Sequence, residues 1–381
     1  MTKYDVKWGI LSSCPPTACG IATFTTALGR ALTYLGADVS VVRILEGADA
    51  PSTSPFAVRA QLRPRDASSL ARTAAALNRC DVALVQHEFG LYGGRDGDDV
   101  ISVLDELHVP VASILHTVLP SPTEHQRSVL NDVIRLSTCV IVMTAAAETT
   151  LRLVYDVGVT RVRVIPHGAA LGLVPLSPAT GEGPILLTWG LIGPGKGIEW
   201  VIDAMMDLRD VSPRPSYVVA GRTHPKVLAY EGDTYRHSLE RRVQENGVGD
   251  MVFFDNNYRK LASLNALIAS AAVVILPYDS SDQATSGVLV DAIAAGRPVI
   301  ATSFPHSLEM LASGAGVVVE HGNAHAISDA VRSIICHPHV AQRMALEARR
   351  LAPSLSWDGV AVRYDTMARD LIRSATWPVS A

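Results

Sequence analysis

A polar stretch around Gln283 has the residue types of a phosphate-binding site. The apolar run 271–277 is typical of a buried strand in a parallel sheet, so the polar residues 278–286 follow the carboxyl end of that strand. Open α/β sheets bind their ligands at this edge. Residues 285–287 then begin a helix, whose first N–H groups and positive dipole end favour an anion. The stretch therefore predicts a seat for a phosphate group.

Gln283 and Asp291 could both touch the ligand of this site. They are eight residues apart, one in the loop and the other two turns into the helix. The neutral amide of Gln283 can donate and accept hydrogen bonds, whereas the carboxylate of Asp291 only accepts them. The alternative is an ordinary loop followed by an alanine-rich core helix, which is the commoner account of any one such residue.

A glycine-rich loop in the second half is another candidate for phosphate binding. The pattern predicts a strand at 184–189, a loop Gly190-Leu-Ile-Gly-Pro-Gly-Lys-Gly197 and an amphipathic helix at 198–208. Lys196 would meet a phosphate there as a point charge. The loop falls one residue short of a P-loop, because Gly197 stands where a Ser or Thr must hold magnesium. A P-loop-like nucleotide hydrolase or switch therefore stays open as an alternative.

Length and composition indicate two α/β domains. The chain has 381 residues, 48% of them hydrophobic, which is more than one core usually supports. No apolar run predicts a transmembrane segment and the N-terminus carries no signal-peptide pattern, so we expect a cytoplasmic protein. The net charge of −4 argues against a nucleic-acid partner. Five scattered cysteines indicate reduced thiols, and a metal site at Cys14 and Cys19 or at 336–339 is disfavoured.

Strands and helices alternate along both halves, on either side of a Pro- and Gly-rich linker at 170–183. Strands are predicted at 6–11, 39–44, 81–86, 109–116, 139–143, 163–165, 184–189 and 271–277, at the starts of 217–225 and 251–258, and at the end of 283–302. Helices are predicted at 21–35, 66–79, 98–107, 198–208, 325–336, 338–350 and 357–373.

Two segments in the first half contain polar residues that could have either a structural or a functional role. The loop 87–98 is either a surface turn or, through Arg95 and its neighbours, a ligand-binding loop. Its Asp96-Gly-Asp98 has the form of a metal-chelating motif but does not directly follow a strand, so we predict that it caps the next helix. His116 ends a predicted strand, where a lone histidine is more often structural.

Together these segments resemble the GT-B-fold, retaining, nucleotide-sugar-dependent glycosyltransferases of the glycosyltransferase family 4 type. The family's Glu-x7-Glu segment corresponds to Gln283 and Asp291, and its Gly-Arg-x4-Lys-Gly loop corresponds to 190–197. Two departures stand out, because Gln283 has lost a charge and Leu191 replaces the phosphate-binding arginine. Arg222 is the nearest candidate to replace that arginine.

The resemblance implies a GT-B architecture of two Rossmann-like, doubly wound parallel-sheet domains facing a central cleft. It assigns acceptor binding to residues 1–175 and nucleotide-sugar binding to residues 184–355. A C-terminal helix within 356–381 would return to the first domain.

The implied activity is the retaining transfer of a hexose, of the glucose or mannose class, from a UDP- or GDP-sugar to a hydroxyl of a small-molecule or glycan acceptor. The family mechanism needs no metal or other cofactor: the donor's β-phosphate helps to deprotonate the acceptor in a front-face substitution. A homodimer is compatible with the family. A non-catalytic sugar-nucleotide-binding protein stays open, because Gln283 and Leu191 each lack a charge that the usual enzyme uses.

The resemblance and the polar loops together predict three groups of site residues and no metal ligand. The predicted catalytic residues are His116, Lys196 and Gln283. The predicted donor contacts are Gly20, Gly190, Lys196, Arg222, Asn256, Asn257, Thr285, Ser286, Gly287, Val288 and Asp291. The predicted acceptor contacts are Ile21, Thr23, His87, Glu88 and Arg95.

Overall fold

The chain folds into two compact α/β units. The computed structural model describes residues 5–17, 19–45, 51–158, 161–169, 183–257, 259 and 261–376. The first unit comprises Met1–Gly168 and Trp357–Ala381, and the second comprises Ala169–Ser356. All but the last residue of the predicted linker at 170–183 lies outside the described residues.

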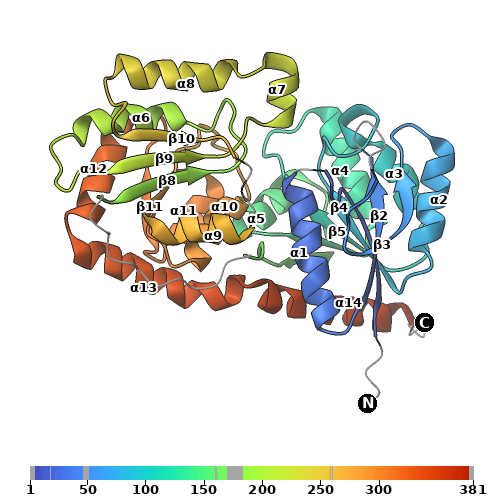
Figure 1. Ribbon diagram of the computed structural model, residues 1–381. Helices are drawn as coiled ribbons and strands as arrows, with labels where there is room; N and C mark the ends of the chain where they lie inside the picture. Colours follow the sequence, from blue (N-terminus) through green and yellow to red (C-terminus); the bar gives the residue numbers. More distant parts are fainter. Residues whose placement is uncertain are drawn as a thin grey trace. The chain divides into compact units, whose positions relative to one another are not determined.

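The first unit is built on a parallel sheet, as the sequence predicted (Figure 1). Its described strands run in the order β3-β2-β1-β4-β5-β6-β7. They are β1 (Lys7–Ser12), β2 (Asp38–Ile44), β3 (Ala57–Leu62), β4 (Val82–His87), β5 (Val111–Leu115), β6 (Cys139–Val142) and β7 (Val162–Val164). Because the chain winds outward in both directions from β1 and β4, the carboxyl ends of these two strands form the switch point where such sheets bind ligands. The sequence analysis missed β3, a half-exposed edge strand without a continuous apolar run.

Helices cover this sheet, and the last helix of the chain belongs to the same unit. They are α1 (Gly20–Tyr34), α2 (Ala67–Leu77), α3 (Asp99–Asp105), α4 (Glu124–Leu136), α5 (Ala145–Val154) and α14 (Trp357–Thr376). Helix α14 packs on α1 (Figure 1), where the Trp357 and Phe24 ring centroids lie 4.9 Å apart. Helices α4 and α5 were not predicted, although Thr123 and Thr144 cap them.

The prediction that Asp96-Gly-Asp98 caps a helix is wrong. Asp98 stands at the N-cap of α3 with helical backbone angles, φ −64° and ψ −14°, and makes no side-chain cap hydrogen bond. Its backbone continues the helical path, so the carboxylate does not turn towards the first N–H groups. Asp96 and Asp98 instead contact the imidazole of His125, at 2.8 and 3.6 Å.

The second unit repeats the strand order of the first. Its parallel sheet runs β10-β9-β8-β11-β12-β13, so β8 and β11 flank the switch point. The strands are β8 (Ile185–Trp189), β9 (Ser216–Ala220), β10 (Val252–Asp255), β11 (Ala271–Leu276), β12 (Val299–Thr302) and β13 (Gly316–Val319). The helices are α6 (Ile198–Asp207), α7 (Pro225–Glu231), α8 (Thr234–Glu245), α9 (Leu261–Ser270), α10 (Gly287–Ala294), α11 (Pro305–Leu311), α12 (Ala324–Ile335) and α13 (Pro338–Leu355).

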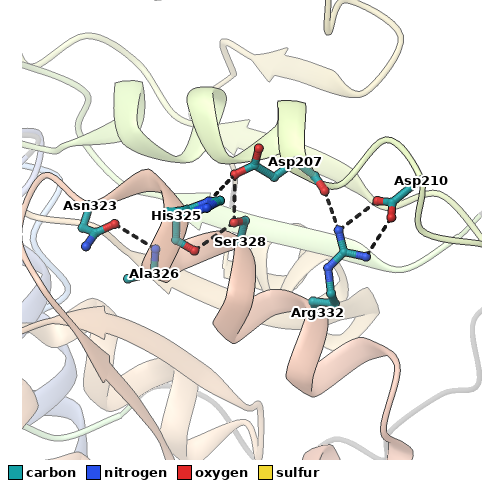
Figure 2. Close-up of polar contacts among 7 residues, drawn as sticks. All are labelled: Asp207, Asp210, Asn323, His325, Ala326, Ser328 and Arg332. Carbon is teal, nitrogen blue, oxygen red and sulfur yellow. Dashed lines mark hydrogen bonds and ion pairs between the residues drawn. The ribbon is translucent and has the colours of Figure 1, made fainter.

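Polar contacts from α12 hold the end of α6 (Figure 2). The carboxylate of Asp207 accepts a hydrogen bond from Ser328 Oγ at 3.1 Å and contacts His325 Nδ1 at 2.8 Å. Arg332 Nη2 donates to the Asp207 carbonyl at 2.6 Å, and its guanidinium also pairs with Asp210. Because the start of α6 follows the glycine-rich loop, these contacts anchor the helix that carries the loop.

The described helices include none that is long and apolar enough to cross a membrane.

Candidate functional site

The backbone of the glycine-rich loop admits little besides glycine. Gly197 has a φ of +64° at the N-cap of α6, and a Cβ there would lie 1.7 Å from the Pro277 carbonyl oxygen. The loop is also bonded to the segment after β9. The Gly190 N–H donates to the Ala220 carbonyl at 3.0 Å, and the Ile192 N–H donates to the Arg222 carbonyl at 2.8 Å. The loop therefore lies beside Arg222, whose side chain is exposed.

Lys196 is held over an aromatic ring. Its Nζ lies 4.5 Å from the centroid of Tyr278, which stacks on Phe304 at 5.3 Å. Burial lowers the pKa of Lys196. Among the described residues, no carboxylate lies within 4 Å of its ammonium group. The side chain is thus a partly desolvated cation whose charge remains available to an anion.

The N-terminus of α10 lies beside the same tyrosine. Burial raises the pKa of Tyr278 to about 12, and a hydrogen bond with the Ser286 side chain opposes the rise. Ser286 caps the helix, its Oγ accepting from the Leu289 N–H at 3.3 Å. The N–H groups of Gly287 and Val288, the first two of the helix, have no partner within it. These two amides and Lys196 form the candidate phosphate seat.

The prediction of a free amide at Ser286 is wrong. Its N–H donates to Nδ1 of His306 at 2.8 Å, and His306 is only 2% exposed. A buried imidazole nitrogen that lacks a donor would cost free energy, so this bond is retained in the folded unit. His306 was missed because it lies 20 residues further along the chain, with no motif to connect it to Ser286.

The two residues of the predicted Gln-x7-Asp pair are half-buried on either side of the α10 N-terminus. Gln283 Nε2 donates one hydrogen bond to the Thr285 carbonyl at 3.1 Å, and its carbonyl oxygen and second N–H can still meet a ligand. Asp291 lies in the second turn of α10. The structure thus places Gln283 before the free amides and Asp291 after them in the chain.

A buried arginine joins the loops after β9 and β10. Arg236 of α8 is 5% exposed, and its Nη2 donates to the Gly221 carbonyl at 2.7 Å. Its Nη1 donates to Asn256 Oδ1. The sequence analysis missed Arg236, because an arginine on a polar helix is ordinarily a solvated residue.

In the first unit, polar side chains form a chain of hydrogen bonds at the switch point. His116 Nε2 lies 2.5 Å from Gln86 Oε1, and Gln86 Nε2 donates to Thr25 Oγ1 at 3.3 Å. Thr25 Oγ1 in turn lies 2.7 Å from Ser12 Oγ. Burial lowers the pKa of His116 to about 3, and His167 and His87 contribute. His116 is therefore neutral, with the Nε2 proton donated to Gln86 and Nδ1 left as an acceptor.

The predicted acceptor residues occupy different environments. On α1, Ile21 is half-buried and Thr23 is exposed. The helix begins at Gly20, and the side chain of Cys19 caps its N-terminus. Arg95 is exposed and, with His125, lines an open hollow of about 490 Å³.

Direct contact between His87 and an acceptor is not supported. Its side chain is 0% exposed, and neither ring nitrogen has a partner among the described residues. The next residue, Glu88, accepts hydrogen bonds from Thr117 Oγ1 at 2.6 Å and from the Phe89 N–H at 2.9 Å. The end of β4 thus turns His87 inwards, and Glu88 helps to hold the loop that follows.

Parts of the chain are similar to known proteins. Residues 177–351 match the family model "Glycosyl transferases group 1". A segment of 184 residues, 48% of this chain, is 29% identical to D-inositol 3-phosphate glycosyltransferase of Corynebacterium glutamicum (strain R). That segment spans 42% of the relative, so the match covers less than half of its length.

Two solved structures share the fold over nearly the whole chain. Sucrose-phosphate synthase from Thermosynechococcus elongatus superposes with a TM-score of 0.78 at 20% identity, covering 97% of this chain and 100% of that one. Anabaena Alr3699/HepE in complex with UDP and glucose superposes with a TM-score of 0.76 at 15% identity, covering 96% and 100%. Residues 177–351 are therefore similar to a glycosyl transferases group 1 domain, and the chain as a whole has the GT-B fold.

Proposed function

We propose that this chain is a retaining glycosyltransferase that moves a hexose from a UDP- or GDP-sugar to a hydroxyl acceptor without a metal ion. One observation carries the proposal. A cation and two helix amides lie at the carboxyl edge of the neighbouring strands β8 and β11. The cation is Lys196, whose Nζ is 4.5 Å from the Tyr278 centroid, and the amides are the N–H groups of Gly287 and Val288. A cation and helix amides at a switch point suit a diphosphate.

The proposed reaction uses these groups. The bond between the anomeric carbon and the β-phosphate oxygen breaks, and its electron pair stays on the phosphate. The acceptor oxygen forms a bond to the same face of that carbon, and its proton passes to a β-phosphate oxygen. Lys196 and the amides of Gly287 and Val288 stabilise the charge that grows on the leaving diphosphate.

The remaining predicted donor residues have complementary roles. Arg222 supplies a second cation beside the glycine-rich loop, in the absence of an arginine at 191. Asp291 accepts from the ribose, and the Gln283 oxygen accepts from a sugar hydroxyl. The Anabaena protein was solved with UDP and glucose and with UDP-glucose, which supports a UDP-hexose donor.

The first unit is proposed to bind the acceptor through Ile21, Thr23 and Arg95. Neutral His116 would bind a sugar hydroxyl, because its unprotonated Nδ1 can accept a hydrogen bond.

The P-loop alternative conflicts with the backbone at Gly197. A magnesium-binding Ser or Thr at that position would need a Cβ 1.7 Å from the Pro277 carbonyl oxygen, at a φ of +64°. A non-catalytic sugar-nucleotide-binding protein would keep the phosphate seat and lack turnover.

Calorimetric titration with UDP, GDP, ADP and ATP, with and without magnesium, tests the proposal. We expect a nucleoside diphosphate to bind without metal. Tight ATP binding that requires magnesium would contradict the proposed function. Release of UDP or GDP from a sugar nucleotide, measured with a panel of hydroxyl acceptors, then separates the transferase from a binding protein.

A further inference from the structure

Four backbone N–H groups at the start of α10 have no carbonyl partner within the helix. They belong to Ser286, Gly287, Val288 and Leu289. The Ser286 N–H donates to His306 Nδ1 at 2.8 Å, and the Leu289 N–H donates to Ser286 Oγ at 3.3 Å. No described residue accepts from the Gly287 or Val288 N–H. The outer two donors are thus occupied by the protein, and the middle two remain for a ligand.

The imidazole of His306 is buried and held in one orientation. It is 2% exposed and lies in the first turn of α11. The adjoining Ser307 donates its hydroxyl to the Phe304 carbonyl at 2.8 Å, and the Phe304 ring stacks on Tyr278 at 5.3 Å. A backbone N–H only donates, so the contact with Ser286 requires Nδ1 to be unprotonated. His306 is therefore a neutral acceptor at the back of the α10 N-terminus.

Ser286 connects His306 to both parts of the phosphate seat. Its peptide group leads directly into the two free amides of α10. Its side chain forms a hydrogen bond with Tyr278, whose ring centroid lies 4.5 Å from Lys196 Nζ. A shift of Ser286 would therefore move the amides and the aromatic ring together. Displacements of about 1 Å in a site can cost about a hundredfold in rate.

We infer that His306 is a positioning residue for the proposed sugar transfer. By accepting from the Ser286 N–H, it fixes the direction of the two free amides and the place of the ring beside Lys196. This inference rests on the proposed function. The imidazole is buried and bonded to Ser286, so it acts through that residue and not by contact with the donor. The alternative is a buried hydrogen bond that contributes only to stability.

Two substitutions separate the hydrogen bond from the rest of the side chain. His306→Leu offers no acceptor, so the Ser286 N–H is left without its partner. His306→Asn restores an acceptor, because its Oδ1 is as many bonds from the backbone as Nδ1 of histidine. The probe is UDP or GDP, whichever the wild type binds more tightly. We expect His306→Leu to lose at least about tenfold in affinity and His306→Asn to stay within about threefold of the wild type.

The lost affinity should concern the phosphate groups alone. Inorganic pyrophosphate, titrated by itself, should lose as much affinity for His306→Leu as the nucleoside diphosphate does. Uridine or guanosine carries no phosphate and should bind His306→Leu as well as it binds the wild type. In turnover, kcat should fall by a larger factor than KM rises, because the charge on the leaving diphosphate is greatest in the transition state.

Tyr217→Phe is the matched control for a loss of stability. Tyr217 of β9 is 0% exposed and donates to Thr188 Oγ1 at 2.9 Å, so this variant also removes one buried hydrogen bond from the second unit. It should lower the Tm, as His306→Leu does, and leave the affinity for pyrophosphate unchanged. If His306→Leu does not fold, His306→Gln replaces it, because its amide oxygen is one bond further from the backbone than Nδ1.

Three results would overturn the inference while leaving the proposed function intact. In the first, His306→Leu loses the nucleoside as badly as the nucleoside diphosphate, which indicates general damage. In the second, His306→Leu binds pyrophosphate as tightly as the wild type or more tightly, which shows that the released Ser286 N–H joins the seat. In the third, a folded His306→Asn binds as weakly as His306→Leu. A wild type that binds no nucleoside diphosphate would instead contradict the proposed function, and the inference with it.

Discussion

The two units share a strand order but differ in the chemistry at their switch points. In the first unit, the side chains of Ser12, Thr25, Gln86 and His116 form a chain of hydrogen bonds among neutral groups. In the second unit, Lys196 and the α10 N-terminus occupy the corresponding edge, with Arg222 and Arg236 further along it. The same topology thus carries a largely buried chain of neutral polar groups at the switch point of one unit and cationic groups at that of the other.

This difference shows that one strand order can carry two kinds of chemistry at its carboxyl edge. A parallel sheet provides the place, because loops at its carboxyl edge converge at the switch point. The residues in those loops decide the ligand. Neutral donors and acceptors suit a hydroxyl-rich molecule, and cations with helix amides suit a diphosphate.

Removing the charge from the cationic edge should have the largest effect. Lys196→Ala loses a charge-assisted contact with the diphosphate, which is worth about 2–4 kcal/mol of transition-state stabilisation. We expect turnover to fall by about a few tens to several hundredfold, measured as steady-state product release. Lys7→Ala, which removes an exposed lysine at the start of β1, is the control. Unchanged kinetics in a folded Lys196→Ala protein would mean that the loop is structural and that the contrast between the edges has no catalytic meaning.

The buried histidines should make the first unit sensitive to acid. Burial lowers the pKa of His87 to about 4, below the unfolded value of 6.5. The unfolded chain therefore takes up the proton first, and the stability from neutral His87 is complete above pH 6.5 and lost between 6.5 and about 4. At about pH 5 the loss amounts to about 2 kcal/mol.

His87→Leu should remove this loss without destabilising the unit near neutral pH, since neither ring nitrogen has a described partner. Hydrogen exchange in β4, compared between about pH 7 and about pH 5, measures it. His108→Gln changes an exposed histidine of the same unit and should behave like the wild type. An equal acid response in His87→Leu would contradict the expectation.

The two ends of the Gln283–Asp291 segment should respond to different parts of the donor. Gln283→Ala should weaken binding of the sugar nucleotide about tenfold more than binding of the free nucleotide, because it removes a hydrogen bond to the sugar only. Asp291→Ala should weaken both about equally. Titration of each variant with UDP and UDP-glucose, or the GDP pair, provides the comparison. If Gln283→Ala loses the nucleotide as badly as the full donor, the sugar lies at the other end of the segment.

The smallest effect should be a pH response of opposite sign in the second unit. The hydrogen bond to Asp207 raises the pKa of His325 above 6.5 (Figure 2). Its contribution to stability is therefore complete below pH 6.5 and is lost as the pH rises through the folded pKa. Both side chains are exposed, so the change should be small. In the wild type and in His339→Gln, the protection of α6 amides against hydrogen exchange should fall as the pH rises through the folded pKa of His325, and in His325→Gln this fall should be absent. The same fall in the wild type and both variants would show that the His325–Asp207 pair contributes nothing to stability.

Much of the cationic edge could be predicted from local patterns. The apolar run before Pro277 became β11, and the glycine-rich loop led into α6 as expected. Hydrophobic period, glycine spacing and cap residues act over a few neighbouring residues, so a short window of sequence contains them. The half-exposed strand β3 was missed for the same reason, because its window lacks that signal.

The errors concern groups that are paired over long distances. Ser286 looked like a free helix amide, but its N–H is bonded to His306. No sequence pattern singled out Arg236, which is buried and bonded to Gly221 and Asn256. Each pairing depends on which elements the sheet brings together.

The sequence by itself therefore determined the alternation of strands and helices, the positions of the glycine-rich loop and the α10 cap, and the resemblance to glycosyltransferases. Tertiary structure alone decided which amides stay free, which cation is buried and which side chain holds the Ser286 N–H. The physical reason is that helix and strand formation depends on neighbouring residues. Burial and hydrogen-bond pairing depend instead on partners that only the folded sheet places within reach.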